Sequence, residues 1–267
     1  MSFGNFNLFY KPGMKKKRPI INKFWKEKLF RKKRFEAYTT TFNGHTLHVH
    51  DQASFRLGYS ELFEEEVYKF SSSSGNPYII DCGSNMGMSI IYFKSIFPGS
   101  RIVAFEADPY VFSFLEKNIQ SFGFTDVTIN NKAVWNVNDE VLSFLAEGGA
   151  GGRLQEKSGQ FKFIDVKTAR LKDYLTEEID FLKIDIEGAE YKVLTDCIEG
   201  LHFVKNLFIE YHSMGNDTQN LHLVLQIVHE SGFRYHIKEA YTSPFPFMER
   251  KLNFGMDLQL NIFCYRS

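Results

Sequence analysis

Short apolar runs alternate with segments of helical period along residues 77–267. Runs such as "YIID" are continuously apolar, as expected for strands of a sheet whose two faces are covered by helices. Helical segments follow at 88–97, 109–122, 189–201 and 218–232. The alternation predicts a mostly parallel sheet built from βαβ units. The last two runs, 234–241 and 258–266, have no helix between them and should pair antiparallel.

A different pattern precedes this alternation. Residues 38–51, "YTTTFNGHTLHVHD", contain two alternating segments around Asn43-Gly44, which predicts a hairpin. Residues 60–70, "SELFEEEVYKF", predict a helix with Ser60 as its N-cap, and the Ser-rich stretch 71–77 predicts a linker. We therefore expect a basic, partly helical segment 1–37, a lead-in 38–76 of hairpin plus helix, and a main domain 77–267.

Charge separates the first 34 residues from the rest. They hold twelve of the 32 Lys/Arg and one of the 32 Asp/Glu, so a segment of net +11 precedes a body of net −11. Within it, "PIINKFWKEKLFRKKR" places its apolar residues near one helical face with Lys and Arg around them. Residues 15–34 can therefore contact an anionic membrane, bind nucleic acid, or dock on the body as a solvated helix.

The cysteines and the apolar runs indicate in which cellular compartment the protein is found. Cys82, Cys197 and Cys264 lack C-x-x-C spacing, which indicates reduced thiols and argues against a disulfide framework or a zinc site. No apolar run approaches the roughly 20 residues of a spanning helix, and the first residues lack a signal-peptide pattern. We expect a cytoplasmic location, either free or peripheral at the inner face of the membrane.

The candidate chemistry lies where the predicted parallel strands end, at one edge of the sheet. After the first strand, Asp81 precedes Gly83 and Gly87, which are spaced G-x-x-x-G and not as the dinucleotide pattern G-x-G-x-x-G. Glycines let the backbone approach a ligand, and the following helix start offers free N–H groups. The carboxylate of Asp81 would repel a pyrophosphate, but it suits a ligand that carries an ammonium or sulfonium group.

Further acids follow the later strands. Glu106 lies 19 residues beyond Gly87, about the spacing of an acid that binds ribose hydroxyls. The stretches "KIDIEGAE" (183–190) and "FIEYH" (208–212) should bring four acids and one imidazole to the same edge. Helix capping is the alternative explanation for these acids, above all for Glu187 and Glu190.

The run Asp81-x-Gly83-x-Asn85-x-Gly87, together with Glu106, "NNKAV" and "KIDIEGAE", resembles class I S-adenosylmethionine-dependent methyltransferases. More narrowly, residues 41–265 resemble the FkbM-type family. The resemblance implies a Rossmann-like three-layer α/β/α sandwich with an N-terminal α+β extension. Its mostly parallel seven-stranded sheet would have the order 3-2-1-4-5-7-6, with the last strand antiparallel.

The resemblance also implies the cofactor, S-adenosyl-L-methionine, and the residues that bind it. Gly83 to Gly87 would pass under its methionine part, Asp81 would serve the ammonium group directly or through water, and Glu106 would hold the ribose. The full set implied is Asp81, Gly83, Ser84, Asn85, Gly87, Glu106, Ala107, Asn131, Ala133 and Asp185.

The reaction implied is O-methylation of a hydroxyl on a glycan, glycolipid or secondary metabolite. His212 is our first choice as the catalytic base, since an unperturbed imidazole titrates near neutrality. A strand-end histidine without a role is the alternative. Asp185 and Glu187 compete, either as bases or as ligands of a divalent ion that acidifies the hydroxyl. We assign no metal.

Two other functions remain as alternatives. An NAD-dependent oxidoreductase is disfavoured by the missing third glycine and by the antiparallel pair of C-terminal strands. A nucleic-acid-directed methyltransferase or binder would use the basic segment, but the body is acidic and has no N-P-P-Y-like motif. The Gly-rich loop 148–152 and the aromatic loop 241–256 should shape the acceptor pocket, and no motif identifies the acceptor.

Overall fold

The computed structural model describes residues 34–145 and 163–266, which fall within one compact unit, Lys32–Ser267. The predictions for the basic segment before residue 34 and for the Gly-rich loop 148–152 lie outside the described residues.

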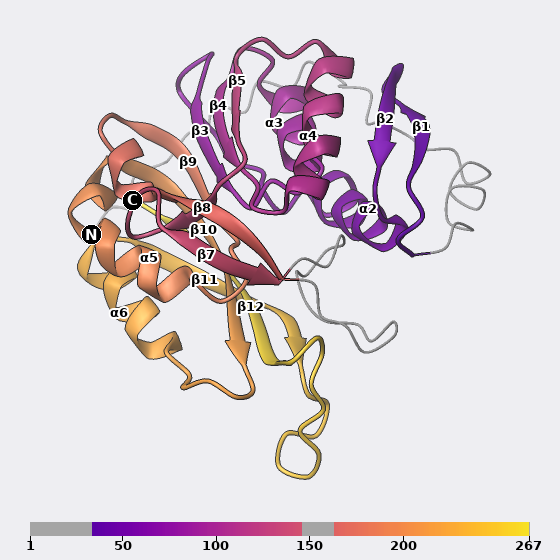
Figure 1. The fold of residues 1–267 in the computed structure, drawn as a ribbon. Helices are drawn as coiled ribbons and strands as arrows, with labels where there is room; N and C mark the ends of the chain where they lie inside the picture. Colours follow the sequence, from indigo (N-terminus) through magenta and orange to yellow (C-terminus); the bar gives the residue numbers. More distant parts are fainter. Residues whose placement is uncertain (1–33, 146–162, 267) are drawn as a thin grey trace, which may run out of the picture. The chain divides into compact units, whose positions relative to one another are not determined.

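A seven-stranded sheet forms the middle of this unit (Figure 1). Neighbouring strands from β5 to β10 are parallel, whereas β12 is antiparallel to both β10 and β11. This order and the antiparallel last strand confirm the predicted topology 3-2-1-4-5-7-6. In spatial order the strands are β5 (Val127–Asn130), β4 (Arg101–Phe105), β3 (Tyr78–Cys82), β9 (Ile179–Ile184), β10 (Val204–Met214), β12 (Met256–Tyr265) and β11 (Arg234–Thr242).

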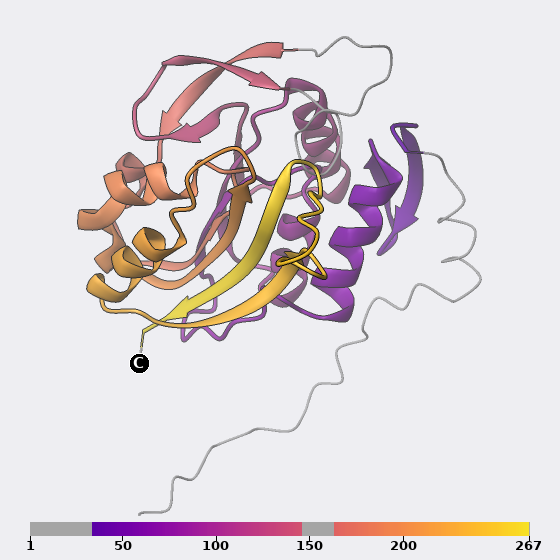
Figure 2. The same cartoon turned by 90° about the horizontal axis from the view of Figure 1, so that it is seen from below.

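Helices cover both faces of the sheet (Figures 1 and 2). Because both faces are covered, every residue of β3 and of β9 is buried. The predicted three-layer α/β/α architecture is therefore confirmed. One layer contains α2 (Gln52–Tyr59), α3 (Met88–Ile96) and α4 (Pro109–Phe122), and the other contains α5 (Glu190–Cys197) and α6 (Leu221–Glu230). None of the helices in the described part of the chain has the length and hydropathy to span a bilayer.

The lead-in differs from its prediction in one respect. Strands β1 (Tyr38–Phe42) and β2 (His45–Val49) form the expected hairpin, with Asn43 at φ 52° and Gly44 at φ 86° in its turn. The helix predicted from Ser60 is wrong at both ends: α2 begins at Gln52 and continues as the π-helix η1 (Ser60–Glu64). The N-cap is Asp51, whose carboxylate accepts from the backbone N–H groups of Ala53 and Ser54. The boundary at residue 77 stays a prediction.

Residues 127–135 form two short strands that belong to different sheets. After β5, the chain turns away and forms β6 (Ala133–Trp135), which pairs parallel with β8 (Phe163–Arg170). Strand β7 (Val141–Leu145) pairs antiparallel with β8 and completes a three-stranded sheet. The side chain of Asn131 donates to the carbonyls of Glu106 and Ala107, which ties the turn between β5 and β6 to the end of β4. Two 3₁₀ turns, η2 (Leu171–Tyr174) and η3 (Ile198–Phe203), complete the elements.

Gly83 is required by the close contact between the ends of β3 and β9. Its φ is +91°, and a Cβ added there would lie 1.9 Å from the backbone oxygen of Asp185. We expect Gly83→Ala to lower the free energy of unfolding, measured by urea denaturation, by more than about 3 kcal/mol. The matched control is Gly123→Ala, at φ +68° with no atom within 4 Å of the new Cβ, which should cost only about 1–2 kcal/mol. Equal losses in the two variants would contradict this reading.

Candidate functional site

A cavity of about 650 Å³ opens between the ends of β3 and β9, the point where the strand order reverses. Such a switch point is the usual ligand crevice of an open α/β sheet. Residues from the lead-in, from the small sheet and from the loops after β3, β4 and β9 line it. The predicted site residues that line it are Gly83, Ser84, Asn85, Glu106, Ala107, Ala133, Asp185, Glu187 and His212. Asp81, Gly87 and Asn131 are not in its lining.

Hydrogen bonds to β4 fix the loop after β3. The N–H groups of Gly83 and Ser84 both donate to the carbonyl of Phe105, at 3.0 and 2.8 Å. Gly87 closes the loop at φ +90° and starts α3, where an added Cβ would lie 2.8 Å from a methyl carbon of Leu115. Gly87 is therefore required by the close packing between α3 and α4. The residues of this loop that face the cavity are Gly83 to Asn85.

Asp81 is fully buried and lies behind the cavity wall. Its carboxylate accepts a 2.5 Å hydrogen bond from the Ser89 hydroxyl and lies 3.4 Å from the ammonium nitrogen of Lys183. Ser89 and Lys183 both line the cavity, so Asp81 contacts two lining side chains without lining the cavity itself.

Lys183 is a site residue that the sequence analysis missed. Its Nζ donates to the carbonyl of Gly83 at 2.8 Å and lies 3.1 Å from Asp185 Oδ2. Burial alone would lower the pKa of this ammonium group, but Asp185, Tyr68 and Asp81 together raise it well above 10.5. The available signal was a lysine inside "IDFLKI", a run that reads as a buried strand, because a buried lysine requires anionic partners.

Glu106 lies at the end of β4 and faces the cavity with its carboxylate already held. One oxygen accepts from the N–H of Asn85 at 2.9 Å and the other from the N–H of Asp108 at 2.8 Å. Burial raises the pKa of this carboxyl to about 7. Each carboxylate oxygen keeps a further lone pair, so Glu106 can still accept hydrogen bonds from a pair of ligand hydroxyls.

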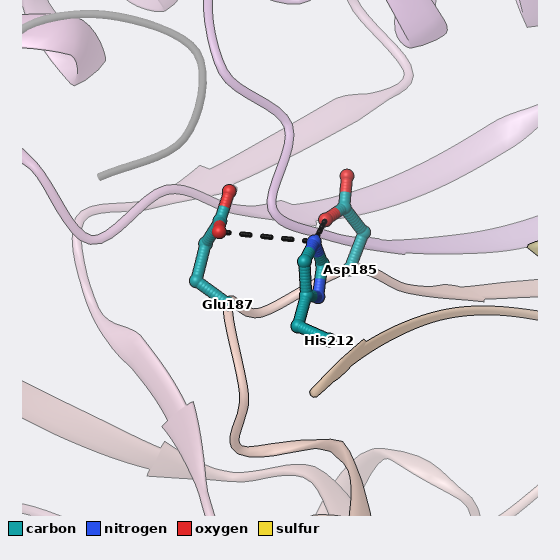
Figure 3. A group of neighbouring side chains, drawn as sticks. All are labelled: Asp185, Glu187 and His212. Atoms are coloured by element: carbon teal, nitrogen blue, oxygen red, sulfur yellow. Dashed lines mark ion pairs between the residues drawn. The ribbon is translucent and has the colours of Figure 1, made fainter. Parts of the chain in front are cut away.

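Three predicted catalytic residues meet at the other side of the crevice (Figure 3). The Nε2 atom of His212 lies 3.7 Å from Glu187 Oε2 and 3.9 Å from Asp185 Oδ1. Glu187, at φ +56°, and Gly188, at φ +102°, make the sharp turn after β9. The ligand atoms of Asp185, Glu187 and His212 all lie within 4.8 Å of one another, so this group can hold a metal ion.

Two further acids surround this imidazole, which is almost completely buried. Nδ1 of His212 is hydrogen-bonded to Glu190 Oε1 at 2.9 Å, and Glu210 Oε1 lies 3.9 Å from Nε2. Burial alone would lower the pKa of His212, but Glu187 and Glu190 raise it well above 6.5. The surrounding carboxylates therefore favour the imidazolium form of this ring.

The carboxylates in this part of the cavity outnumber its cations. Burial, followed by the charge of Asp185, raises the pKa of Glu210. The same two causes raise the pKa of Glu61 to about 7. Glu61 was missed because it comes from the π-helix of the lead-in, whose position no motif marks. Such a site favours a cationic ligand or a bound cation.

Comparisons with known proteins give one matching family model and two relatives that are named as methyltransferases. Residues 81–235, more than half of the chain, match the family model described as the methyltransferase FkbM domain. Methyltransferase sdnD of Sordaria araneosa is 27% identical over 188 residues, which cover 57% of this chain and 73% of the relative. Methyltransferase 1 of Beauveria bassiana is 28% identical over 160 residues, which cover 51% and 64%.

A solved structure supports the fold. The crystal structure of methyltransferase FkbM from Methylobacillus flagellatus matches with a TM-score of 0.50 at 15% identity. The match covers 78% of this chain and 48% of that chain, so this protein spans about half the length of the solved one.

Among the described lysines, Lys183 should lower the free energy of unfolding most when its charge is removed. We expect Lys183→Met to lower the free energy of unfolding by about 3–5 kcal/mol, because Asp81 and Asp185 lose the cation that compensates them. Chemical denaturation at neutral pH measures this. Lys69→Met, which removes the exposed ion pair with Glu66, is the control and should cost no more than about 1 kcal/mol. A Lys183→Met protein as stable as the control would contradict the proposed pairing.

Proposed function

This chain belongs to the FkbM methyltransferase family, and from that premise we propose that it methylates a hydroxyl of a glycan, glycolipid or secondary metabolite. The methyl donor is S-adenosylmethionine. The observation that carries the proposal is that the glycine loop, Glu106 and the His212 cluster all line one cavity. A site for the cofactor and a set of proton-accepting groups for the hydroxyl are thereby present together.

The residues of the cavity fit this cofactor. The backbone from Gly83 to Asn85 lines the cavity, and the buried carboxylate of Glu106 can accept from two ribose hydroxyls. Ala107 and Ala133 would border the adenine, and Asn131, which does not line the cavity, would act only by holding the carbonyls of Glu106 and Ala107. The excess of carboxylates beside Asp185 suits a sulfonium charge, whereas it would repel a pyrophosphate. When bound, S-adenosylmethionine supplies a sulfonium-activated methyl carbon.

The protein's task is then to orient the acceptor oxygen and to take its proton. Transfer breaks the carbon–sulfur bond, forms a carbon–oxygen bond and releases the hydroxyl proton. We assign that proton to Nε2 of His212, whose ring Glu190 orients through Nδ1. Because the surrounding carboxylates favour the imidazolium form, His212 must first lose its own proton before it can accept this one.

Asp185 and Glu187 allow a second explanation of how the acceptor hydroxyl loses its proton. Together with His212 they can bind a divalent ion, which would acidify the hydroxyl directly. In that case the imidazole is a ligand and cannot accept the proton. Activity in the presence of a chelator distinguishes the two assignments.

The general experiment is a transfer assay with isotope-labelled S-adenosylmethionine and a panel of hydroxylated glycans, glycolipids and polyketides. Calorimetric titration with S-adenosylhomocysteine and with NAD gives the cofactor preference separately. We expect binding of S-adenosylhomocysteine and none of NAD. Tight binding of NAD, or methyl transfer restricted to nucleic acid, would overturn the proposal.

Glu106 makes cofactor affinity depend on pH. Its pKa of about 7 means that the carboxyl loses its proton as pH rises from 6 to 8, and only the ionised form accepts from both ribose hydroxyls. The dissociation constant of S-adenosylhomocysteine should therefore fall with rising pH, by up to about tenfold per unit below the pKa. Titration calorimetry measures this. Glu106→Gln should remove that part of the dependence, and a pH profile unchanged in this variant would contradict the ribose role.

Removal of the imidazole should affect turnover more than cofactor binding. We expect His212→Ala to lower kcat by about 10²–10⁴-fold while the dissociation constant of S-adenosylhomocysteine changes less than about threefold. In the wild type, kcat should rise with pH above neutrality, because the imidazolium must lose its proton. His222→Ala, an exposed histidine on α6, is the control. Unchanged turnover in His212→Ala, or loss of wild-type activity in EDTA with recovery in Mg²⁺, would exclude His212 as the base.

A further inference from the structure

The loop between β11 and β12 exposes an unusual set of apolar side chains. Among the described residues, the three most exposed large apolar side chains are Phe247, Met248 and Phe245, at 103%, 89% and 64%. All three lie in residues 244–252, which we call the hairpin tip. Singly exposed apolar residues are ordinary, but three within four positions mark an interaction site.

Backbone hydrogen bonds, and not apolar packing, build this tip. The N–H groups of Met248 and Glu249 both donate to the carbonyl of Phe245, at 2.9 and 2.7 Å. At its base, the hydroxyl of Ser243 donates to the carbonyl of Glu249. Pro244 and Pro246 fix two more backbone angles. The loop extends beyond the ends of β11 and β12 (Figure 1), and its turn is formed while its apolar side chains remain in solvent.

The chemistry around the tip favours a lipid surface as the partner. Arg250 and Lys251 directly follow the apolar residues, and only Glu249 opposes them, so the tip carries a net positive charge. Aromatic and aliphatic side chains beside Lys and Arg are typical of segments that lie at an anionic membrane interface. Stable attachment to a membrane usually needs two such signals. The segment 1–34, with twelve Lys/Arg and one acid, supplies a second one in the same chain.

We propose that the hairpin tip inserts Phe245, Phe247 and Met248 into the interface of an anionic membrane. Asn253, Phe254 and Met256, which directly follow the tip, line the cavity. Insertion therefore brings the cavity towards the membrane surface, where a lipid-held acceptor can reach it. Insertion of the hairpin tip does not depend on the proposed function. The access of a lipid-held acceptor to the cavity, in contrast, rests on the proposed methyltransferase function.

Vesicle binding of the full chain tests the proposal. We compare vesicles of phosphatidylcholine alone with vesicles that also contain about 30% phosphatidylserine, a strongly anionic surface. The wild type should sediment with the anionic vesicles. Replacing all three side chains, Phe245→Ser, Phe247→Ser and Met248→Ser, should lower the partition constant at least about tenfold. The matched control replaces three apolar residues exposed elsewhere, Val137→Ser, Val141→Ser and Ile198→Ser, and should bind as the wild type does.

A fluorescence measurement locates the contact directly. Phe247→Trp should give an added emission component that shifts to the blue with anionic vesicles, and Tyr110→Trp, exposed on α4, should not. Titration with S-adenosylhomocysteine confirms that each variant is folded, and it separates failure of the tip proposal from failure of the methyltransferase proposal.

Three results would overturn the proposal. The wild type could fail to bind anionic vesicles, or the triple tip variant could bind as tightly as the control. In sedimentation velocity, the wild type could also form a dimer that the tip variant abolishes, while neither binds vesicles. That last result would assign the tip to a second copy of the chain.

Discussion

The ammonium group of Lys183 is buried between two strand ends, and the crevice is arranged around it. It lies 3.1 Å from Asp185, 3.4 Å from Asp81 and 2.8 Å from the carbonyl of Gly83. Because an unpaired buried ammonium is very unfavourable, its partners must stay in place. The glycine loop after β3 and the first acid after β9 are therefore held together by one ion, and Gly83 has no side chain because that contact leaves no room.

Asp185 links this ion to the second cation of the site. One of its oxygens lies 3.1 Å from Lys183 Nζ and the other 3.9 Å from His212 Nε2. Loss of the imidazolium proton leaves the charge of Asp185 to be compensated mainly by Lys183, which also holds Gly83. The protonation state of the catalytic cluster is therefore coupled electrostatically to the loop that we assign to the cofactor.

The sequence predicted what depends on local pattern and strand ends. The sheet order followed from the strand–helix alternation and the consecutive C-terminal strands, and the positions of Glu106 and His212 followed from parallel strands ending at one edge. What it missed depends on contacts far apart in the chain. The pairing of β6 with β8 joins residues more than 30 positions apart, and Lys183 donates to the carbonyl of Gly83, which lies 100 positions before it. The start of α2 was missed because Asp51 and Ser60 are both good caps, and local pattern does not choose between them.

Strand β12 lies between β10 and β11, although it follows both of them in the chain. As the chain leaves the ribosome, every loop of the crevice is made before the strand that covers the outer edge of β10. Until residues 256–265 emerge, β10 is an open edge with unpaired backbone groups, and such edges promote misassembly between chains. Pairing of the ten-residue strand β12 is therefore the step that removes this open edge and joins β11 to the rest of the sheet.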